Sequence, residues 1–132
     1  MPPETKPKVL MIDDEKFLLD IYSTKFLKSG FDVFACHSVD EGLAILQKGY
    51  EPAVILFDIT MPEKDGYVFL EGISQLHLKN MPLKIALTNE GQEGELKRMK
   101  ELGTDIHLSK ASFTPAEIVE RVRSLLAGNG RS

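Results

Sequence analysis

The stretch AVILFDITMPEKDG, residues 53–66, runs five apolar residues directly into a carboxylate. Continuous apolar runs of this length are typical of strands buried on both faces, which occur in parallel sheets covered by helices. Asp58 follows the run, and Pro62 with the pair Asp65-Gly66 indicates a turn just beyond it. The rest of the sequence must explain why a buried strand ends on a charge.

Apolar runs of this kind alternate along the chain with segments of helical period. Strands are predicted at residues 8–12, 31–36, 53–57, 83–88 and 105–109. Helices are predicted at residues 14–29, 38–49, 66–77, 93–103 and 114–128. The first helix is expected to share one broad apolar face among Phe17, Leu18, Ile21 and Phe26.

Two of these helices begin with a capping box. Ser38 stands three residues before Glu41, and Thr114 stands three residues before Glu117. Pro115 occupies the first helical position of the last helix, where its missing N–H costs nothing. The helix that begins at Thr114 is the best-defined helix in the sequence.

The βα order, repeated five times, predicts an α/β protein with an open, doubly wound, five-stranded parallel sheet. A chain of 132 residues fits one domain with a substantial core. We expect that domain at residues 8–127, with loose ends at 1–7 and 128–132. In such sheets, ligands bind beyond the carboxyl ends of the strands, where the strand order reverses.

Composition narrows the class of protein. Hydrophobic residues make up 42% and charged residues 27%, as in soluble globular domains, and the net charge of −4 argues against nucleic acid as a partner. No apolar run is long enough to span a membrane and the N-terminus has no signal peptide pattern, so a cytoplasmic location is expected. Cys36 is the only cysteine, which excludes an internal disulfide and suggests a small buried apolar residue.

Chemically active side chains collect at the ends of four predicted strands. Asp13 and Asp14 follow the first strand, Asp58 the third, Thr88 closes the fourth and Lys110 follows the fifth. Clustered carboxylates repel each other and favour a hard cation such as Mg²⁺. Asp58 is then a plausible nucleophile for phosphoryl transfer, with Lys110 sharing the neutralisation of charge and Thr88 donating a hydrogen bond.

These motifs resemble the receiver domain of two-component response regulators, a flavodoxin-like fold. The resemblance covers about residues 7–127 and rests on MIDDE (11–15), FDITMPEKDG (57–66), LT (87–88) and LSK (108–110). It implies a signalling protein, not an enzyme for an outside substrate, because such a domain catalyses only its own phosphorylation and dephosphorylation. It also implies that the third strand ends on a charge in order to present a nucleophile.

The resemblance assigns a role to each of these residues. Asp58 would be the phosphoacceptor, Lys110 would pair with the phosphoryl group, and Thr88 would move toward it together with a switch at His107. Asp13, Asp14, Asp58 and the backbone carbonyl of Thr60 would hold Mg²⁺. The implied partners are a sensor histidine kinase or histidine phosphotransfer protein and a downstream output protein or domain, with no direct nucleic acid binding and no membrane contact.

Three residues depart from the family pattern. Ala111 follows Lys110 where the family usually has proline, so the loop that carries Lys110 is expected to differ. His107 stands where the family usually has tyrosine or phenylalanine, and Asn89 replaces a small residue. These changes bear on switching and on the lifetime of the phosphoryl group.

Two other functions fit part of the sequence. A pseudo-receiver, which binds a partner without switching by phosphate, is favoured by the changes at Ala111, His107 and Asn89. A phosphatase-like hydrolase with Asp58 as nucleophile would need a second acid two residues later, and Thr60 stands there instead. The sequence is consistent both with a stand-alone receiver and with a piece of a longer protein.

Overall fold

A computed structural model describes residues 6–89 and 91–128. Within these residues, five strands and five α-helices alternate, with one 3₁₀ helix, η1, before the fourth α-helix. The elements are β1 Lys8–Ile12, α1 Lys16–Lys28, β2 Asp32–Cys36, α2 Val39–Gln47, β3 Val54–Asp58, α3 Gly66–Leu76, β4 Leu83–Thr88, η1 Glu93–Glu95, α4 Leu96–Glu101, β5 Ile106–Ser109 and α5 Pro115–Leu126.

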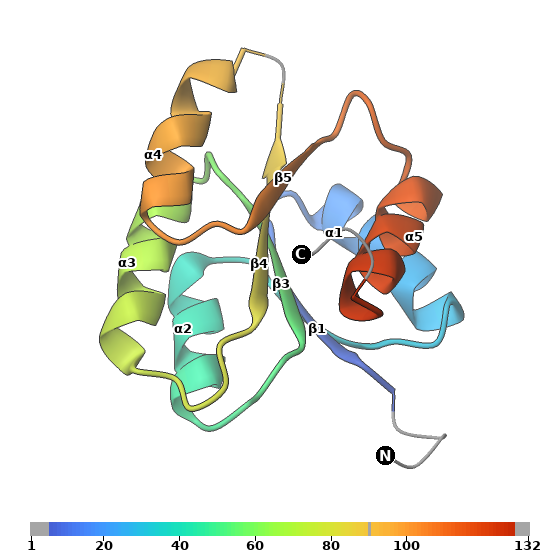
Figure 1. Cartoon of the computed structure of the whole chain (residues 1–132), viewed down its shortest axis with the longest axis horizontal. Helices are drawn as coiled ribbons and strands as arrows, with labels where there is room; N and C mark the ends of the chain where they lie inside the picture. Colours follow the sequence, from blue (N-terminus) through green and yellow to red (C-terminus); the bar gives the residue numbers. More distant parts are fainter. Residues whose placement is uncertain (1–5, 90, 129–132) are drawn as a thin grey trace.

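The strands form one parallel sheet in the order β2-β1-β3-β4-β5 (Figure 1). From β1 the chain moves to one side to form β2 and then crosses to the other side to form β3, so the strand order reverses between β1 and β3. This arrangement confirms the predicted doubly wound fold. The loops that follow β3, β4 and β5 gather at the upper end of the sheet in Figure 1, which is the expected edge for a ligand site.

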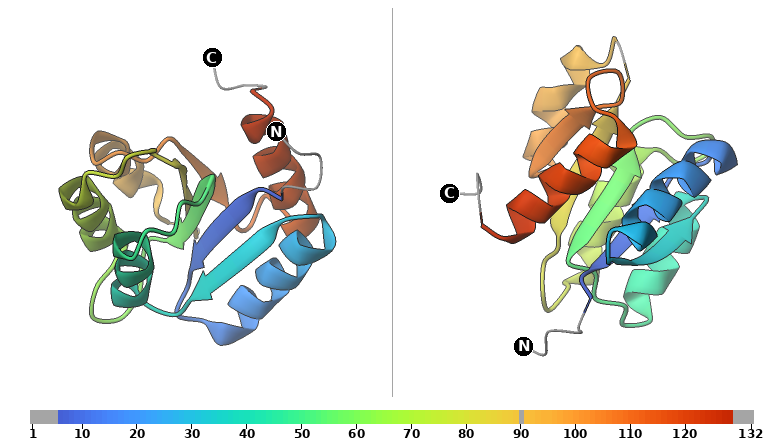
Figure 2. Two further views of the ribbon diagram at one scale, coloured as in Figure 1. Left: turned by 90° about the horizontal axis from the view of Figure 1, so that it is seen from below. Right: turned by 90° about the vertical axis from the view of Figure 1, so that its right-hand side faces the viewer.

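Helices cover both faces of the sheet. α1 and α5 lie on one face and α2, α3 and α4 on the other, as the views in Figure 1 and Figure 2 show. Each face has its own apolar core, one built around the buried side chains of α1 and α5 and the other around those of α2 and α3. All five residues of β3 and all six of β4 are buried, including the polar residues Asp58, Lys84 and Thr88.

The face of α1 that packs on the sheet differs from the prediction. Leu19, Tyr22 and Phe26 are the buried residues of this helix, whereas Phe17 is 76% exposed and Ile21 is 36% exposed. Apolar residues occur almost all round α1, so their period does not select one face. The residues that contact the core are spaced three and four positions apart and start at Leu19, not at Phe17.

The two predicted capping boxes differ in detail. The Thr114 hydroxyl accepts from the Glu117 N–H at 3.1 Å while the Glu117 carboxylate accepts from the Thr114 N–H at 2.8 Å, which is a complete box. Ser38 accepts from the Glu41 N–H at 3.2 Å, but the Glu41 carboxylate accepts from His37 instead. The first helix begins after Glu15, which makes no side-chain cap.

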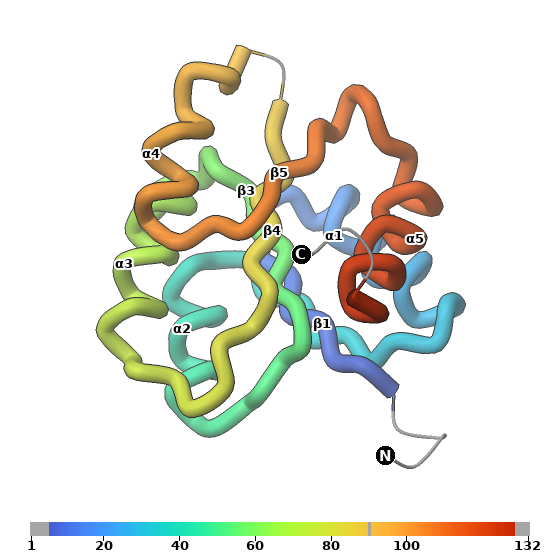
Figure 3. The backbone as a smooth tube through the Cα atoms, in the orientation of Figure 1, coloured from blue at the N-terminus to red at the C-terminus, as the bar shows by residue number. Residues whose placement is uncertain are grey.

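The fourth helix is shorter than predicted. The fourth helix was predicted at residues 93–103, but it is a 3₁₀ turn at Glu93–Glu95 followed by a short α4 at Leu96–Glu101. The path of this segment is visible in the tube of Figure 3. The predicted loose ends at 1–7 and 128–132 lie largely outside the described residues, although the Pro7 carbonyl accepts from the Asp32 N–H at 2.9 Å.

Close packing between α2 and α3 explains why Gly72 is tolerated inside a helix. A Cβ at position 72 would lie 2.6 Å from a methyl carbon of Leu43, so the Leu43 side chain would have to move to admit any larger residue. Cys36 is buried, as predicted, and burial raises the pKa of its thiol to about 12. None of the described helices is long and apolar enough to cross a membrane.

Candidate functional site

The carboxyl edge of the sheet brings a lysine against two buried carboxylates. The Lys110 Nζ lies 3.3 Å from an Asp58 carboxylate oxygen and 3.6 Å from an Asp13 carboxylate oxygen. The carboxylate side chains are 5% exposed and the lysine side chain is 13% exposed. Residues that follow β1, end β3 and follow β5 therefore meet in one place, as the sequence predicted.

Asp14 completes an acidic group with Asp13 and Asp58. One carboxylate oxygen of each lies within 4.8 Å of the others, with Asp14 on the exposed side. The Oδ2 atom of Asp13 is buried and accepts no hydrogen bond among the described residues; the charge nearest to it is the Lys110 amine, at 3.6 Å. A buried carboxylate oxygen that accepts no hydrogen bond and has only a long ion pair, beside two more carboxylates, suits a hard cation with oxygen ligands, so these residues fit the predicted Mg²⁺.

Burial and charge shift the pKa values at this site. Burial raises the pKa of Asp58 to about 6; Lys110 opposes the rise and Asp13 adds to it. Burial alone would lower the pKa of Lys110, but the charges of Asp58 and Asp13 outweigh it and raise that pKa. Near neutral pH, the ion pair of Asp58 and Lys110 is therefore the prevailing state.

The loop after β3 contributes a hydrogen bond to the Asp58 carboxylate. Its Oδ1 atom accepts from the Ile59 N–H at 3.0 Å, and the Gly66 N–H donates to the Ile59 carbonyl at 2.8 Å. A Cβ at position 66 would lie 3.0 Å from the Asp58 carbonyl oxygen, so glycine allows α3 to begin against the strand end. Asp65 caps α3 by accepting from the N–H groups of Tyr67 and Val68, both at 3.1 Å.

The predicted switch residues lie on neighbouring strands. Thr88 is buried at the end of β4, and its carbonyl accepts from the Lys110 N–H at 2.8 Å, so the two residues are tied through the backbone. His107 is exposed on β5. Both residues line a cavity of about 280 Å³ that Asn89 and Gln92 also line. The structure therefore brings the two switch positions to one cavity without burying His107.

Alanine after Lys110 does not keep the lysine from the site. No peptide bond within residues 6–89 and 91–128 is cis, and the Ala111 N–H donates to the Ser109 hydroxyl at 3.2 Å. The Lys110 amine nevertheless reaches Asp58. The change at Ala111 therefore does not separate Lys110 from Asp58, and it gives no support to a pseudo-receiver.

Two residues beside the site were not singled out from the sequence. Tyr22 of α1 borders a cavity that Lys110, Asn89 and Ser112 also line, and burial raises its pKa. Gln92 donates from its side-chain nitrogen to the Thr60 hydroxyl at 2.9 Å. The long-range contact of Gln92 leaves no local sequence signal, whereas Tyr22 stands on the helix face that the periodicity failed to select.

Comparisons with known proteins agree with the fold and identify the family. Residues 9–123 match the family described as the response regulator receiver domain. The transcriptional regulatory protein CpxR of Klebsiella pneumoniae is 33% identical over 119 residues, which cover 90% of this chain and 49% of that protein. The response regulator SaeR of Staphylococcus epidermidis is 33% identical over 124 residues, covering 94% of this chain and 52% of that protein.

Solved structures support the same assignment. The receiver domain of the Francisella response regulator 1452 superposes with a TM-score of 0.80 at 27% identity, covering 93% of this chain and 98% of that one. The chemotaxis protein CheY4 of Vibrio cholerae gives a TM-score of 0.82 at 24% identity, covering 90% and 98%, and supports the fold alone.

The family match, on a doubly wound sheet with an acidic group and a lysine at its carboxyl edge, identifies a signalling domain of the two-component class. This chain belongs to the response regulator receiver domain family. The chain spans about half the length of the curated relatives that it matches.

Proposed function

We propose that this receiver accepts a phosphoryl group on Asp58 from a phosphohistidine, and that the phosphorylated form binds a partner differently. The donor would be a sensor histidine kinase or a histidine phosphotransfer protein, and the reader a downstream output protein or domain. One observation carries the proposal: a buried carboxylate at a strand end faces the Lys110 amine at 3.3 Å beside two further carboxylates. We place this activity in the cytoplasm.

The chemistry follows from these groups. An ionised Asp58 oxygen attacks the phosphorus of the phosphohistidine, forming a P–O bond. The P–N bond breaks, and its electron pair returns to the imidazole nitrogen of the donor. Because the pKa of Asp58 is about 6, most of this carboxylate is ionised at neutral pH and ready to attack. Lys110 offers its positive charge to the phosphoryl oxygens in place of the carboxylate that it now pairs with.

Asp13, Asp14, Asp58 and the backbone carbonyl of Thr60 would hold Mg²⁺. When bound, this ion supplies positive charge against the phosphoryl oxygens and relieves the repulsion among the carboxylates. The buried Oδ2 atom of Asp13 supports this assignment, because it accepts no hydrogen bond among the described residues and lies 3.6 Å from the Lys110 amine. Attack of water on the aspartyl phosphate would later release inorganic phosphate and restore Asp58.

The response would begin at Thr88. Its hydroxyl would move toward the phosphoryl group. Because Thr88 and His107 line the same cavity, the space that Thr88 leaves would allow His107 on β5 to move as well. Because His107 is exposed, its movement would alter the surface that a partner meets. Such a switch requires a partner that binds the two states with different affinity.

The mass of the intact protein after incubation with acetyl phosphate and Mg²⁺ tests the proposal. We expect an increase of one phosphoryl group that requires both Mg²⁺ and Asp58, so Asp58→Ala and a metal-free sample stay unmodified. Asp40→Ala is the matched control, since Asp40 is exposed on α2 and pairs only with Lys64 among the described residues. Absence of an adduct in a protein that also fails to bind Mg²⁺ would contradict the proposal and favour the pseudo-receiver.

A further inference from the structure

The side chain of Gln92 bridges the loops that follow β3 and β4. Its nitrogen donates to the Thr60 hydroxyl at 2.9 Å, and its oxygen accepts from the Asn89 N–H at 2.6 Å. The Gln92 backbone N–H also donates to the Asn89 carbonyl at 3.3 Å. Gln92 is therefore anchored to its own loop and reaches across to the other with a single hydrogen bond.

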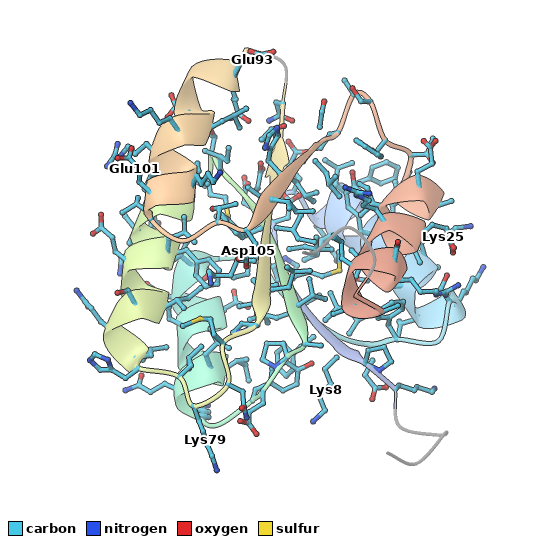
Figure 4. The ribbon with its side chains drawn as sticks, in the orientation of Figure 1. Lys8, Lys25, Lys79, Glu93, Glu101 and Asp105 are labelled. Atoms are coloured by element: carbon cyan, nitrogen blue, oxygen red, sulfur yellow. The ribbon has the colours of Figure 1, made fainter. Side chains whose placement is uncertain are left out.

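This bridge lies at the active edge of the sheet. Figure 3 shows both loops at the same end of the molecule, and Figure 4 labels the next residue, Glu93, at that end. Thr60 is two residues beyond Asp58, and Asn89 directly follows Thr88. β3 and β4 are neighbours in the sheet, with Asp58 opposite Leu87. The Gln92 amide thus connects the loop of the phosphoacceptor to the loop of the switch hydroxyl.

Movement of Thr88 would strain this connection. Asn89 is bonded to Thr88 through the backbone, so a shift of Thr88 toward Asp58 displaces the Asn89 N–H that Gln92 holds. The same side chain lines the cavity shared with Thr88 and His107. A side-chain amide that is hydrogen-bonded at both ends resists displacement more than one that is bonded at one end.

We propose that Gln92 is a positioning residue that stabilises the resting arrangement of the two loops and opposes the switch at Thr88. This inference rests on the proposed function. A group that stabilises only the resting state reduces the population of the switched state, and with it the affinity for any ligand that selects the switched state. Loss of the bridge should therefore favour the phosphorylated conformation.

Beryllium fluoride with Mg²⁺ is a suitable probe, because it mimics the phosphoryl group on a receiver carboxylate and requires no turnover. We expect Gln92→Ala to bind this probe about fivefold more tightly than the unaltered chain, the effect of losing one hydrogen bond of ordinary strength. Thr60→Val removes the hydroxyl but keeps the backbone carbonyl, and it should give a similar gain. The double variant should gain no more than either single variant, because both remove the same connection.

Gln75→Ala is the matched control, since Gln75 is an exposed glutamine on α3, away from both loops. It should leave probe affinity unchanged. Affinity for Mg²⁺ alone should change less than about twofold in Gln92→Ala, because the three carboxylates and the Thr60 carbonyl remain. A variant that had merely lost its local structure would weaken both Mg²⁺ and probe binding.

Hydrogen exchange gives a second readout. The Asn89 amide should be protected in the resting protein, lose that protection in Gln92→Ala, and lose it in the unaltered chain when beryllium fluoride and Mg²⁺ bind. Equal or weaker probe binding by Gln92→Ala, or an Asn89 amide that stays protected with the probe bound, would overturn the inference and leave the proposed function intact. Failure of the unaltered chain to bind the probe at all would overturn both.

Discussion

The starts of α1 and α5 use their polar residues in opposite ways. Thr114 and Glu117 form a complete capping box, so these side chains at the start of α5 hydrogen-bond to the backbone of their own helix. At the start of α1, Asp13, Asp14 and Glu15 offer three acidic side chains, yet Glu15 is the N-cap residue and makes no side-chain cap. Asp13 accepts from the Glu15 N–H at 2.9 Å with one oxygen and directs the other to the site.

The difference shows where the protein favours stability and where it favours chemistry. α5 is built for stability, whereas the strand ends near α1 collect carboxylates that repel each other. The raised pKa of Asp58 shows that its ionised form is disfavoured by the fold. We infer that the acidic group lowers the stability of the domain and is kept for its chemistry. Lys110 and a bound cation supply the compensating positive charge.

Removal of the compensating lysine should have the largest effect on stability. In EDTA at pH 8, we expect Lys110→Ala to lower the free energy of unfolding by about 3 kcal/mol, because it leaves two buried carboxylates without a cation. The loss should shrink below about pH 5, where Asp58 is protonated in the folded state. Urea unfolding followed by circular dichroism measures the free energy of unfolding at both pH values.

Lys64→Ala is the control for this prediction. Lys64 pairs with Asp40 at 2.7 Å, but both side chains are more than half exposed, so its loss should change the free energy of unfolding by less than about 0.5 kcal/mol. Equal effects of the two lysine substitutions would contradict the view that Lys110 compensates buried charge.

Loss of the capping box should have a smaller effect on stability than loss of Lys110. We expect Thr114→Ala to lower the free energy of unfolding by about 1 kcal/mol at any pH from 6 to 8. The reason is that the Glu117 N–H loses its acceptor at the start of α5. Urea unfolding provides the test, with Thr114→Ser as the variant that should restore most of the stability.

Asp14→Asn should have the smallest effect on the fold and a large one on the ion. In EDTA, its free energy of unfolding should stay within about 0.5 kcal/mol of the unaltered chain, because Asp14 is exposed and caps no helix. Its affinity for Mg²⁺, measured by isothermal titration calorimetry, should fall at least about tenfold. Unchanged Mg²⁺ affinity would remove Asp14 from the proposed metal site.

Much of this arrangement was predictable from the sequence. The buried strands are recognisable in the sequence as apolar runs. Because the carboxyl ends of parallel strands share one edge of the sheet, the proximity of Asp13, Asp58 and Lys110 follows from the strand order. The complete cap of α5 was predictable because all its members lie within four residues. Local patterns and a known topology were sufficient in each case.

Other features depend on contacts that local patterns do not encode. Apolar residues surround α1, so the choice of Tyr22 over Phe17 for the core depends on how the helix settles on the sheet. The bridge from Gln92 to Thr60 joins residues 32 positions apart in irregular loops. The effect of Ala111 on the loop could not be predicted either, because the geometry of one peptide bond does not determine where the long side chain of Lys110 ends.

The central claim, that the acidic site is held against the stability of the fold, is tested most directly by the unfolding of Asp58→Asn. The folded-state pKa of Asp58 is about 6, above its ordinary value of 3.8, so ionisation destabilises the fold fully above pH 6 and not at all below about pH 3.8. In EDTA at pH 7.5, Asp58→Asn should therefore be more stable than the unaltered chain by roughly 2–3 kcal/mol, and this gain should vanish toward pH 4. With millimolar Mg²⁺, the gain should shrink, because the ion stabilises only the chain that binds it well. An Asp58→Asn variant that is no more stable than the unaltered chain in EDTA at pH 7.5 would contradict the account.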